Sequence, residues 1–250
     1  MVRSCLAFLL LLALWEIVCL AGVLPSALLP SPPEAAAAFR ELLSVGMPPG
    51  RLLAGHALHS LARVLAGVGL AVLLGVPVGL ALGASGTFRS FFLPLINFFR
   101  PIPPLAWIPL AILWFGLGFF SSVYLIFLGA FFPIALAACS GVRGVDRLYL
   151  DSLRVLRATR RDIWLKALLP GAMPSIVTGV RVGLGVGWMT LVAAEFAGTR
   201  GGYGLGYMIM TARDLQRIDE VVAGMAAIGL IGLGLEFILE RAARRLLRWM

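Results

Sequence analysis

Long apolar segments are the feature that most constrains this chain, because about 20 consecutive apolar residues are enough to cross a lipid bilayer as a helix. Of its 250 residues, 60% are hydrophobic and only 13% are charged, roughly half the charged share of a typical soluble domain. The sequence therefore predicts an all-α fold, a polytopic membrane helical bundle. We expect about six spans, which cover residues 5–24, 61–83, 94–116, 119–140, 174–196 and 219–240.

The basic residues between these spans predict the orientation of the chain in the membrane. Cytoplasmic connections of membrane proteins carry more arginine and lysine than external connections do. One set of connections is much richer in these residues, and it contains both termini and the 141–170 loop. We therefore expect both termini and this loop in the cytoplasm. The net charge of +9 follows from this topology and does not indicate a nucleic-acid partner.

A short surface helix is expected on the external side, in the stretch SPPEAAAAFRELL. Ser31 and Glu34 fit a capping box, and Pro32 suits the first helical position. No chemistry is assigned to this helix.

Small residues recur every four positions in the second span and again in the fifth. Such residues let helix backbones approach closely in lipid, so we expect tight packing inside one bundle, with a moving or subunit interface as the alternative. These residues are Gly67, Ala71, Gly75, Gly79, Gly83, Gly179, Gly183 and Gly187.

Prolines at the start of the third span predict an irregular helix entry. The stretch RPIPPLAWIP holds four prolines, which cannot donate backbone hydrogen bonds. Irregular backbone at membrane depth persists only inside protein or beside a water-filled cavity. A further proline, in GAFFP, predicts a second break. The candidate pathway residues from these stretches are Pro103, Pro104, Trp107 and Pro133. A merely kinked structural helix would explain the same prolines.

Two charged residues of the fifth span are further pathway or gate candidates, because a charge inside a membrane is costly and usually functional. Arg181 lies seven residues into the span, and Glu195 lies near its outer end beside the Gly-rich turn FAGTRGGYGLGY. They stand 14 residues apart, about 21 Å along a helix, so they cannot pair with each other. We expect Glu195 to hold an external gate or brace its turn, whereas Arg181 either lines the pathway or snorkels inward.

The sequence predicts no catalytic residues, no metal site and no cofactor. A phosphate-binding loop needs a Gly-rich turn that ends in Lys followed by Ser or Thr, and the only lysine, Lys166, is followed by Ala167. His56 and His59 have no cysteine or paired carboxylate nearby to complete a metal site. The chain is therefore not expected to be an enzyme.

The 141–170 loop carries a charged, amphipathic helical pattern. Leu153 and Leu156 share one helical face, while Arg154, Arg157 and Arg161 fall on another. An ordinary cytoplasmic loop of a membrane protein would explain the charge. It would not explain the amphipathic order followed by a Leu-Pro pair at a set distance.

This loop, DSLRVLRATRRDIWLKALLPGAMPSIVTGVRVGLG, resembles the signature loop of binding-protein-dependent ABC importer permeases, roughly E-A-A-x3-G-x9-I-x-L-P. RPIPPLAWIPLAILWFGLG, FLGAFFPI and the AAE at Glu195 are similar to the nitrate, sulfonate and taurine branch of that family. The resemblance extends from about residue 58 to the C-terminus. Asp151 stands where the signature has its leading Glu, and Arg157 stands where it has Gly.

The resemblance implies a permease subunit that forms the translocation pathway for a small anion or organic solute, in the inner membrane of a bacterium. It also implies short coupling helices in the 141–170 loop that dock on a separate cytoplasmic ATPase, which binds the ATP. The implied coupling residues are Asp151, Leu153, Arg154, Leu156, Arg157, Arg161, Leu169 and Pro170.

The partners implied by the resemblance are the ATPase subunits, a periplasmic or lipid-anchored substrate-binding protein, a second permease copy that makes a homodimer, and membrane lipids. The resemblance also divides the chain into two parts. Residues 1–57 hold a first transmembrane helix and the external surface helix, and residues 58–250 form the permease core.

An autonomous secondary transporter or channel is the alternative function. It would favour inverted repeats and interior carboxylates that carry protons, and the sequence shows neither clearly.

Arg157 decides the expected conformation of the coupling loop. Glycine tolerates the positive φ that lets a chain bend between two short helices, whereas arginine adopts it at a cost of about 1–2 kcal/mol. We expect the turn to have relaxed into a more continuous helix across 151–162. The alternative is a retained turn in which the ATPase supplies a carboxylate to hold Arg157.

Overall fold

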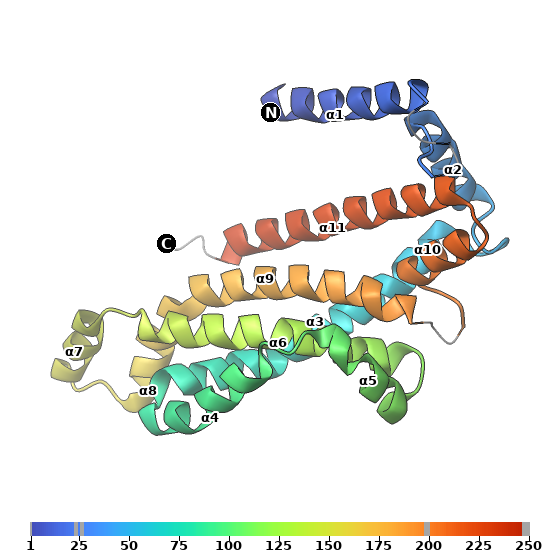
Figure 1. Cartoon of the computed structure of the whole chain (residues 1–250). Helices are drawn as coiled ribbons and strands as arrows, with labels where there is room; N and C mark the ends of the chain where they lie inside the picture. The colour runs from blue at the N-terminus through green and yellow to red at the C-terminus, as the bar shows by residue number, and fades with distance from the viewer. Residues whose placement is uncertain (1, 23–24, 26–27, 198–200, 247–250) are drawn as a thin grey trace. The chain divides into compact units, whose positions relative to one another are not determined.

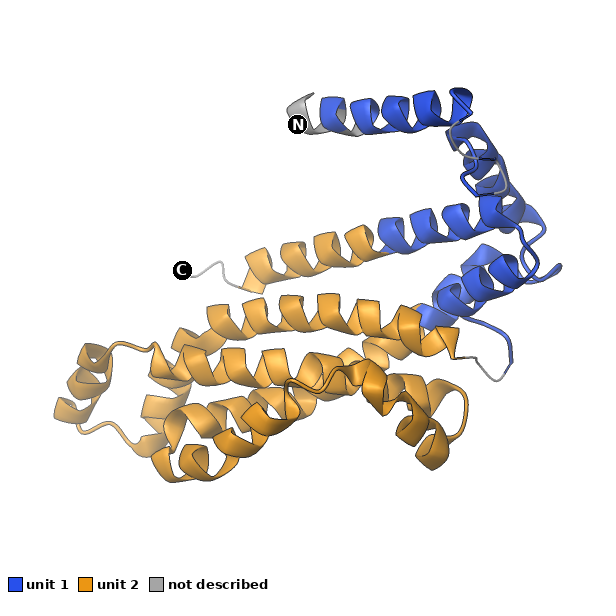
Figure 2. Cartoon of the chain, viewed as in Figure 1, with its two compact units in different colours: residues 1–60, 198–231 blue, residues 61–197, 232–250 orange. Residues whose placement is uncertain are grey.

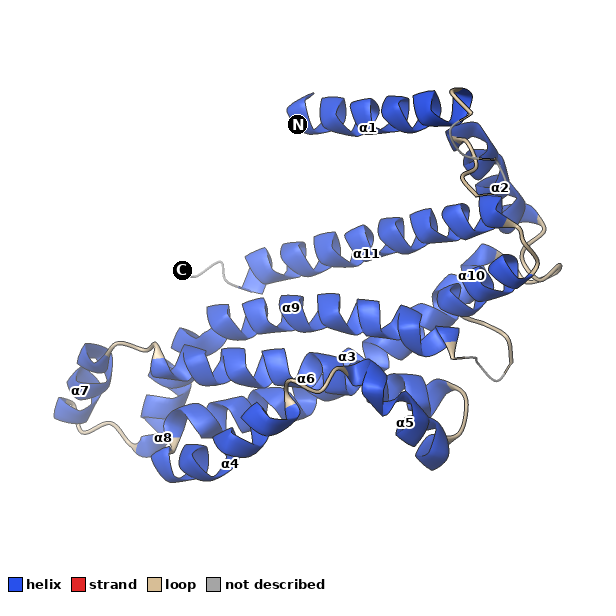
Figure 3. Ribbon diagram, in the orientation of Figure 1, coloured by secondary structure: helices blue, strands red, loops and turns tan. Residues whose placement is uncertain are grey.

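The computed structural model describes residues 2–22, 25, 28–197 and 201–246, and every regular element within these ranges is a helix (Figure 3). This confirms the predicted all-α fold class. The elements, labelled in Figure 1, are α1 (Val2–Leu20), α2 (Pro32–Ser44), α3 (Leu53–Ala84), α4 (Gly86–Phe99), η1 (Pro104–Trp107), α5 (Ile108–Phe115), α6 (Phe119–Arg143), α7 (Arg147–Val155), α8 (Arg160–Ile163), η2 (Trp164–Leu168), α9 (Leu169–Phe196), α10 (Leu205–Asp214) and α11 (Ile218–Leu246).

The chain forms two compact units, coloured separately in Figure 2. The first contains Met1–Ser60 and Gly198–Ile231, and the second contains Leu61–Ala197 and Gly232–Met250. Helices α3 and α11 each begin in the first unit and end in the second. The predicted division of the chain at residues 57 and 58 rests on the family resemblance and stays a prediction.

Among the described residues, four helical stretches are long and apolar enough to span a membrane: α3, α6, Arg160–Phe196 and α11. The pair α4 and η1–α5 would make a fifth span, but it is bent by 83° at residues 100–103. In α1 the apolar helical segment Leu9–Leu20 is shorter than a span. The predicted count of six is therefore not confirmed, and the predicted third span, 94–116, is a helix, a break and a second helix.

The core of the second unit lies where α3, α6 and α9 pack together through the predicted small residues. Helices α6 and α9 run side by side along most of their length (Figure 1). A Cβ atom added to Gly67 would lie 2.6 Å from Ile126 Cγ2, and one added to Gly183 would lie 2.9 Å from Ile134 Cδ1. Both distances are too short for a larger residue, so the expected close packing is confirmed. Ile126 and Ile134 belong to a buried apolar cluster with Val64, Val68, Ala71, Ala130 and Leu191.

In the first unit, α2 begins with the predicted capping box. The Ser31 amide donates to Glu34 Oε2 at 2.7 Å, and the Glu34 amide donates to Ser31 Oγ at 3.4 Å. Pro32 occupies the first turn, where a missing amide hydrogen has no cost. Ala35, Ala38 and Leu42 are spaced three and four apart and are buried, so α2 packs one side against its own unit.

Candidate translocation cavity and coupling surface

A cavity of about 560 Å³ lies in the second unit, walled by the end of α4, the break before η1, and helices α6 and α9. It brings together three of the predicted pathway residues, Pro104, Trp107 and Pro133. Apart from one arginine and two hydroxyl residues, the described part of its lining is apolar. The polar lining residues are Arg100, Ser140 and Thr178. Such a wall, largely apolar with a few polar groups, is typical of a site for a small molecule.

The predicted irregular backbone of RPIPPLAWIP is confirmed and lies at this cavity. Helix α4 ends at Phe99, and Pro103 precedes η1 with φ −62° and ψ 139°, an extended conformation. Consecutive prolines cannot continue the helical hydrogen bonds, and the chain bends by 83° between α4 and η1–α5. Pro104 and Trp107 line the cavity, whereas Pro103 does not. Non-helical backbone beside a cavity is the arrangement that a membrane tolerates.

The predicted break at Pro133 is wrong. Helix α6 continues without interruption from Phe119 to Arg143. A helix in a tightly packed bundle tolerates an internal proline because its neighbours hold the backbone in place. Pro133 has no amide hydrogen, so the carbonyl of Gly129 loses its usual partner four residues on. Gly129 and Pro133 both line the cavity, on the same face of α6.

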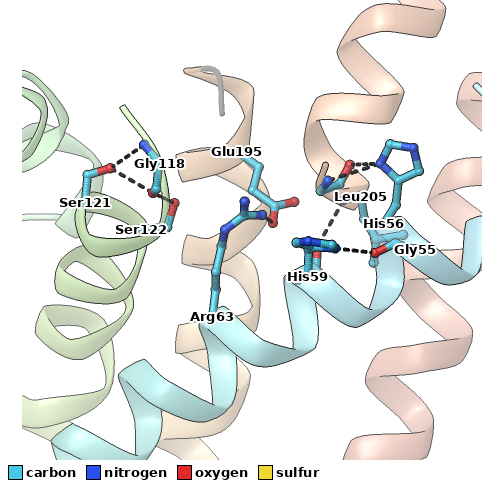
Figure 4. Close-up of polar contacts among 11 residues, drawn as sticks. Gly55, His56, His59, Arg63, Gly118, Ser121, Ser122, Glu195 and Leu205 are labelled. Carbon is cyan, nitrogen blue, oxygen red and sulfur yellow. Dashed lines mark hydrogen bonds and ion pairs between the residues drawn. The ribbon is translucent and has the colours of Figure 1, made fainter. Parts of the chain in front are cut away.

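The two charged candidates of the fifth span lie outside the lining of this cavity and bind different partners. Arg181 makes an ion pair with Glu236 of α11 at 3.3 Å, and both side chains are partly exposed. Glu195 is fully buried and pairs with Arg63 of α3, at 2.6 Å between Nη1 and Oε1 (Figure 4). The expectation that Arg181 and Glu195 cannot pair with each other is confirmed.

Arg63 is a functional candidate that sequence reasoning missed. It lies 132 positions before Glu195, so no local spacing relates the two residues. The available signal was depth, because Arg63 is near the outer end of the second span and Glu195 is near the outer end of the fifth. A buried carboxylate requires a charged or hydrogen-bonding partner, and an arginine at the same depth was a candidate for it.

Two histidine residues in the first unit support the start of α10. His56 is fully buried, and its Nδ1 lies 3.0 Å from the Gly204 carbonyl oxygen (Figure 4). The ring of His59 stacks on Tyr203 at 4.6 Å. In the ranges that the structure describes, no three His, Cys, Asp or Glu side chains are grouped as a metal site requires. The contacts of His56 and His59 are therefore structural.

A second cleft, of about 560 Å³, lies in the 141–170 loop, where α7 stands apart from α6 and α9 (Figure 1). Three of the implied coupling residues, Leu153, Leu156 and Pro170, line it together. Several large apolar side chains of α7 and the following turn are exposed, and Val155 and Leu156 are 82% and 76% exposed. Asp151 and Arg154 form an exposed ion pair at 2.8 Å. The loop thus presents an apolar surface next to charges.

The expectation of a continuous helix across 151–162 is wrong. Helix α7 ends at Val155, and Arg157 has φ +52°, in the left-handed region. The Ala158 amide donates to the Leu153 carbonyl at 2.9 Å, and the Arg157 amide donates to the Arg154 carbonyl at 2.9 Å. These two bonds form a Schellman motif, which satisfies the last carbonyl groups of α7. Its hydrogen bonds offset the steric cost of the left-handed arginine.

The retained turn also changes the positions of the charged residues. Arg154 lies in α7, Arg157 in the turn and Arg161 in α8, so the predicted single arginine face is wrong. Thr159 starts α8 with a capping box to Asp162. Leu169 and Pro170 lie in the first turn of α9 within one helical stretch that runs from Arg160 to Phe196, so the predicted fifth span begins earlier than residue 174.

We expect Arg157→Gly to stabilise the loop by about 1 kcal/mol, because glycine adopts positive φ without the steric cost. Hydrogen exchange of the amides at 156–158 in the detergent-solubilised chain measures this effect, and exchange should slow about fivefold. Arg154→Gly is the matched control. It makes the same chemical change inside α7 and should speed exchange, because glycine lowers helix stability by about 1 kcal/mol. Faster exchange in Arg157→Gly would contradict the left-handed turn.

Comparisons with known proteins agree with this architecture. A family profile described as binding-protein-dependent transport system inner membrane component matches residues 67–250. The taurine transport system permease protein TauC of Escherichia coli is 41% identical over 243 residues, which cover 96% of this chain and 86% of that protein. SsuC of Bacillus subtilis, by its name a permease protein for aliphatic sulfonates, is 35% identical over 239 residues, or 96% and 84% of the two chains.

A solved structure of the MetNI methionine ABC transporter contains a chain of similar fold. Its TM-score is 0.60 at 23% identity, and the match covers 78% of this chain and 94% of that one. At this identity the likeness concerns the fold. The profile and the relatives establish more, since the profile covers most of the chain and TauC matches nearly its whole length. The chain therefore belongs to the family of binding-protein-dependent transport system inner membrane components, as a permease subunit.

Proposed function

We propose that the surface formed by α7, the Arg157 turn and α8 docks on a separate cytoplasmic ATPase that drives import through this permease. The exposed apolar side chains of α7 are the observation that carries the proposal. Leu156 lines the cleft beside α7, and both Leu156 and the preceding Val155 are largely exposed in the described chain. An exposed apolar patch surrounded by charged residues is typical of a surface that binds in a groove on a partner protein.

The energy for transport comes, in this proposal, from the ATPase and not from the permease. A phosphate-binding loop requires a lysine that contacts the nucleotide phosphates. The only lysine of this chain, Lys166, instead forms an ion pair with Asp162 at 2.7 Å, between η2 and α8. The importer then consists of two copies of this chain, two ATPase subunits and an external substrate-binding protein. Both termini and α7 face the cytoplasm of a bacterial cell, as the arginine distribution predicts.

The proposed cargo is taurine or a related small organic sulfonate. The names of two relatives that match nearly the whole chain refer to taurine and to aliphatic sulfonates. The cavity of about 560 Å³ between α4, α6 and α9 is large enough for such a molecule. In an importer of this kind, the binding protein selects the cargo and the permease provides its path.

We further propose that the Arg63–Glu195 pair braces the outer half of α3 against the outer end of α9. Both side chains are buried in the second unit, 4% and 0% exposed. A buried pair of this kind fixes a single geometry, because separating the two charges leaves each without its counter-charge in a medium of low dielectric constant. The pair is therefore suited to hold the external end of the pathway closed to solvent.

Sidedness of labelling tests the proposed orientation. With Cys5, Cys19 and Cys139 replaced by alanine, we expect Ser152→Cys in α7 to react with a membrane-impermeant maleimide only in inside-out vesicles. Leu215→Cys, in the turn after α10, should react only in right-side-out cells. Both positions are exposed in the chain, so accessibility alone does not separate them. Labelling of both from the same side would overturn the orientation.

A further inference from the structure

Among the residues that the structure describes, Arg100 is the one charged residue that lines the cavity between α4, α6 and α9. It lies immediately after α4, where its backbone amide still donates to the Ile96 carbonyl at 2.9 Å. Its side chain is exposed and makes no ion pair or hydrogen bond with the described residues. The Arg63, Arg181 and Arg217 side chains, by contrast, each bind a carboxylate.

The depth of Arg100 makes an unpaired charge costly. In the proposed orientation, α4 starts at the cytoplasmic end of the bundle, and its 14 residues extend about 21 Å into a hydrocarbon layer about 30 Å thick. An arginine at such a depth normally faces a water-filled space or a counter-charge, and it marks the route of an ion or substrate. Arg100 faces the cavity and no counter-charge within the described residues.

The surroundings of Arg100 strengthen its attraction for an anion. The neighbouring lining residues are mostly aromatic and aliphatic, with Phe99, Ile102 and Trp107 closest in sequence. Low-dielectric walls focus the field of a single charge into the cavity. The guanidinium group carries parallel N–H donors that match two oxygen atoms of one oxyanion, so it binds such a group with two hydrogen bonds.

We propose that Arg100 is the residue of this permease that attracts and transiently binds the anionic group of the cargo, a sulfonate or an oxyanion of similar geometry. The inference rests on the proposed function for the identity of the cargo, but not for the electrostatic character of the cavity. The affinity of this site for an anion is low, because a single guanidinium group binds it. Low affinity lets the cargo leave toward the cytoplasm.

The first experiment measures uptake of radiolabelled taurine by the importer reconstituted in vesicles with its ATPase and binding protein. Arg100→Gln should reduce the maximal uptake rate at least about tenfold, because an ionic hydrogen bond to the cargo is lost. Arg100→Lys retains the charge and should recover a large part of the rate. Arg89→Gln is the matched control, since Arg89 lies within α4 and lines a separate pocket of about 270 Å³, and it should transport like the unmodified chain.

The second experiment reads the charge of the cavity without any cargo. Val182 lines the cavity and is 52% exposed, so Val182→Cys in a chain free of other cysteines places a thiol there at nearly constant volume. The probes are two methanethiosulfonate reagents, one bearing a sulfonate and one a trimethylammonium group. The ratio of their reaction rates should favour the sulfonate reagent and fall about tenfold or more with Arg100→Gln, but not with Arg89→Gln.

The two experiments separate this inference from the proposed cargo. If the unmodified importer does not take up taurine, the proposed cargo is wrong, and the reagent ratio still decides the role of Arg100. If taurine is transported equally well by the unmodified chain and by Arg100→Gln, or if the reagent ratio is the same in both, the role assigned to Arg100 is wrong.

Discussion

Replacing Glu195 with glutamine is expected to lower the free energy of unfolding by about 3 kcal/mol or more, because it leaves the Arg63 guanidinium buried without its counter-charge. The two side chains are 4% and 0% exposed and stand 2.6 Å apart, so solvent does little to screen the loss. The measurement is the thermal unfolding midpoint of the detergent-solubilised chain. External access to the pathway should also increase, as reported by a thiol reagent at Val182→Cys.

The matched control is Glu240→Gln, which breaks the Glu240–Arg244 pair at 2.6 Å near the end of α11. Arg244 is 77% exposed, and exposed pairs contribute little, so the expected change is below about 1 kcal/mol. The double change Arg63→Leu and Glu195→Leu should regain most of the stability lost in Glu195→Gln, because it removes both charges together. An unfolding midpoint unchanged in Glu195→Gln would contradict the bracing role.

The second large effect concerns the proposed ATPase-docking surface, formed by α7, the Arg157 turn and α8. Leu156→Asp should weaken binding of the ATPase at least about 30-fold, because it places a charge at the centre of an apolar contact. The side chain is 76% exposed in the chain, so the substitution disturbs no internal packing and the permease should remain folded. Affinity of the purified ATPase for permease in nanodiscs, measured by a surface-based binding assay, provides the test.

Leu215→Asp is the matched control for this prediction. Leu215 is also an exposed leucine at the end of a helix, 59% exposed after α10, and its turn lies on the proposed external side. It should leave ATPase affinity unchanged. Equal affinity of the Leu156→Asp variant and the unmodified chain would show that the ATPase docks elsewhere.

Local sequence rules predicted the parts of the fold that depend on near neighbours. The capping box of Ser31 and Glu34 involves residues three apart, and the close contacts at Gly67 and Gly183 follow from a spacing of four along one helix. The prolines of RPIPPLAWIP remove hydrogen bonds wherever they occur, so a break there was predictable. The 83° bend was not, because it depends on how η1 and α5 pack against α6.

Predictions failed where tertiary or competing local interactions decide the conformation. Helix propensity favours arginine within a helix, but two Schellman hydrogen bonds hold Arg157 in a left-handed turn. Proline usually breaks a helix, but α6 is packed closely enough against α9 to continue through Pro133. The partner of Glu195 could not be found from spacing, since Arg63 lies on a helix that is 132 positions earlier in the sequence.

Some residues of the candidate cavity were predictable from the sequence and one was not. The two proline-containing stretches predict Pro104, Trp107 and Pro133 as pathway residues, and the fold gathers them at one cavity. Arg100 was not selected, although it opens the same RPIPPLAW stretch. Only the three-dimensional arrangement places it on the cavity wall without a counter-charge among the described residues. A charge next to a predicted helix break was the signal in the sequence.

The most direct test of the central claim measures taurine uptake into vesicles that contain the permease, with and without the ATPase. The account predicts uptake only when the ATPase, ATP and the binding protein are all present, and no effect of dissipating proton and sodium gradients. Taurine uptake by the permease alone, driven by an ion gradient without ATP, would contradict it and would identify the chain as an autonomous secondary transporter.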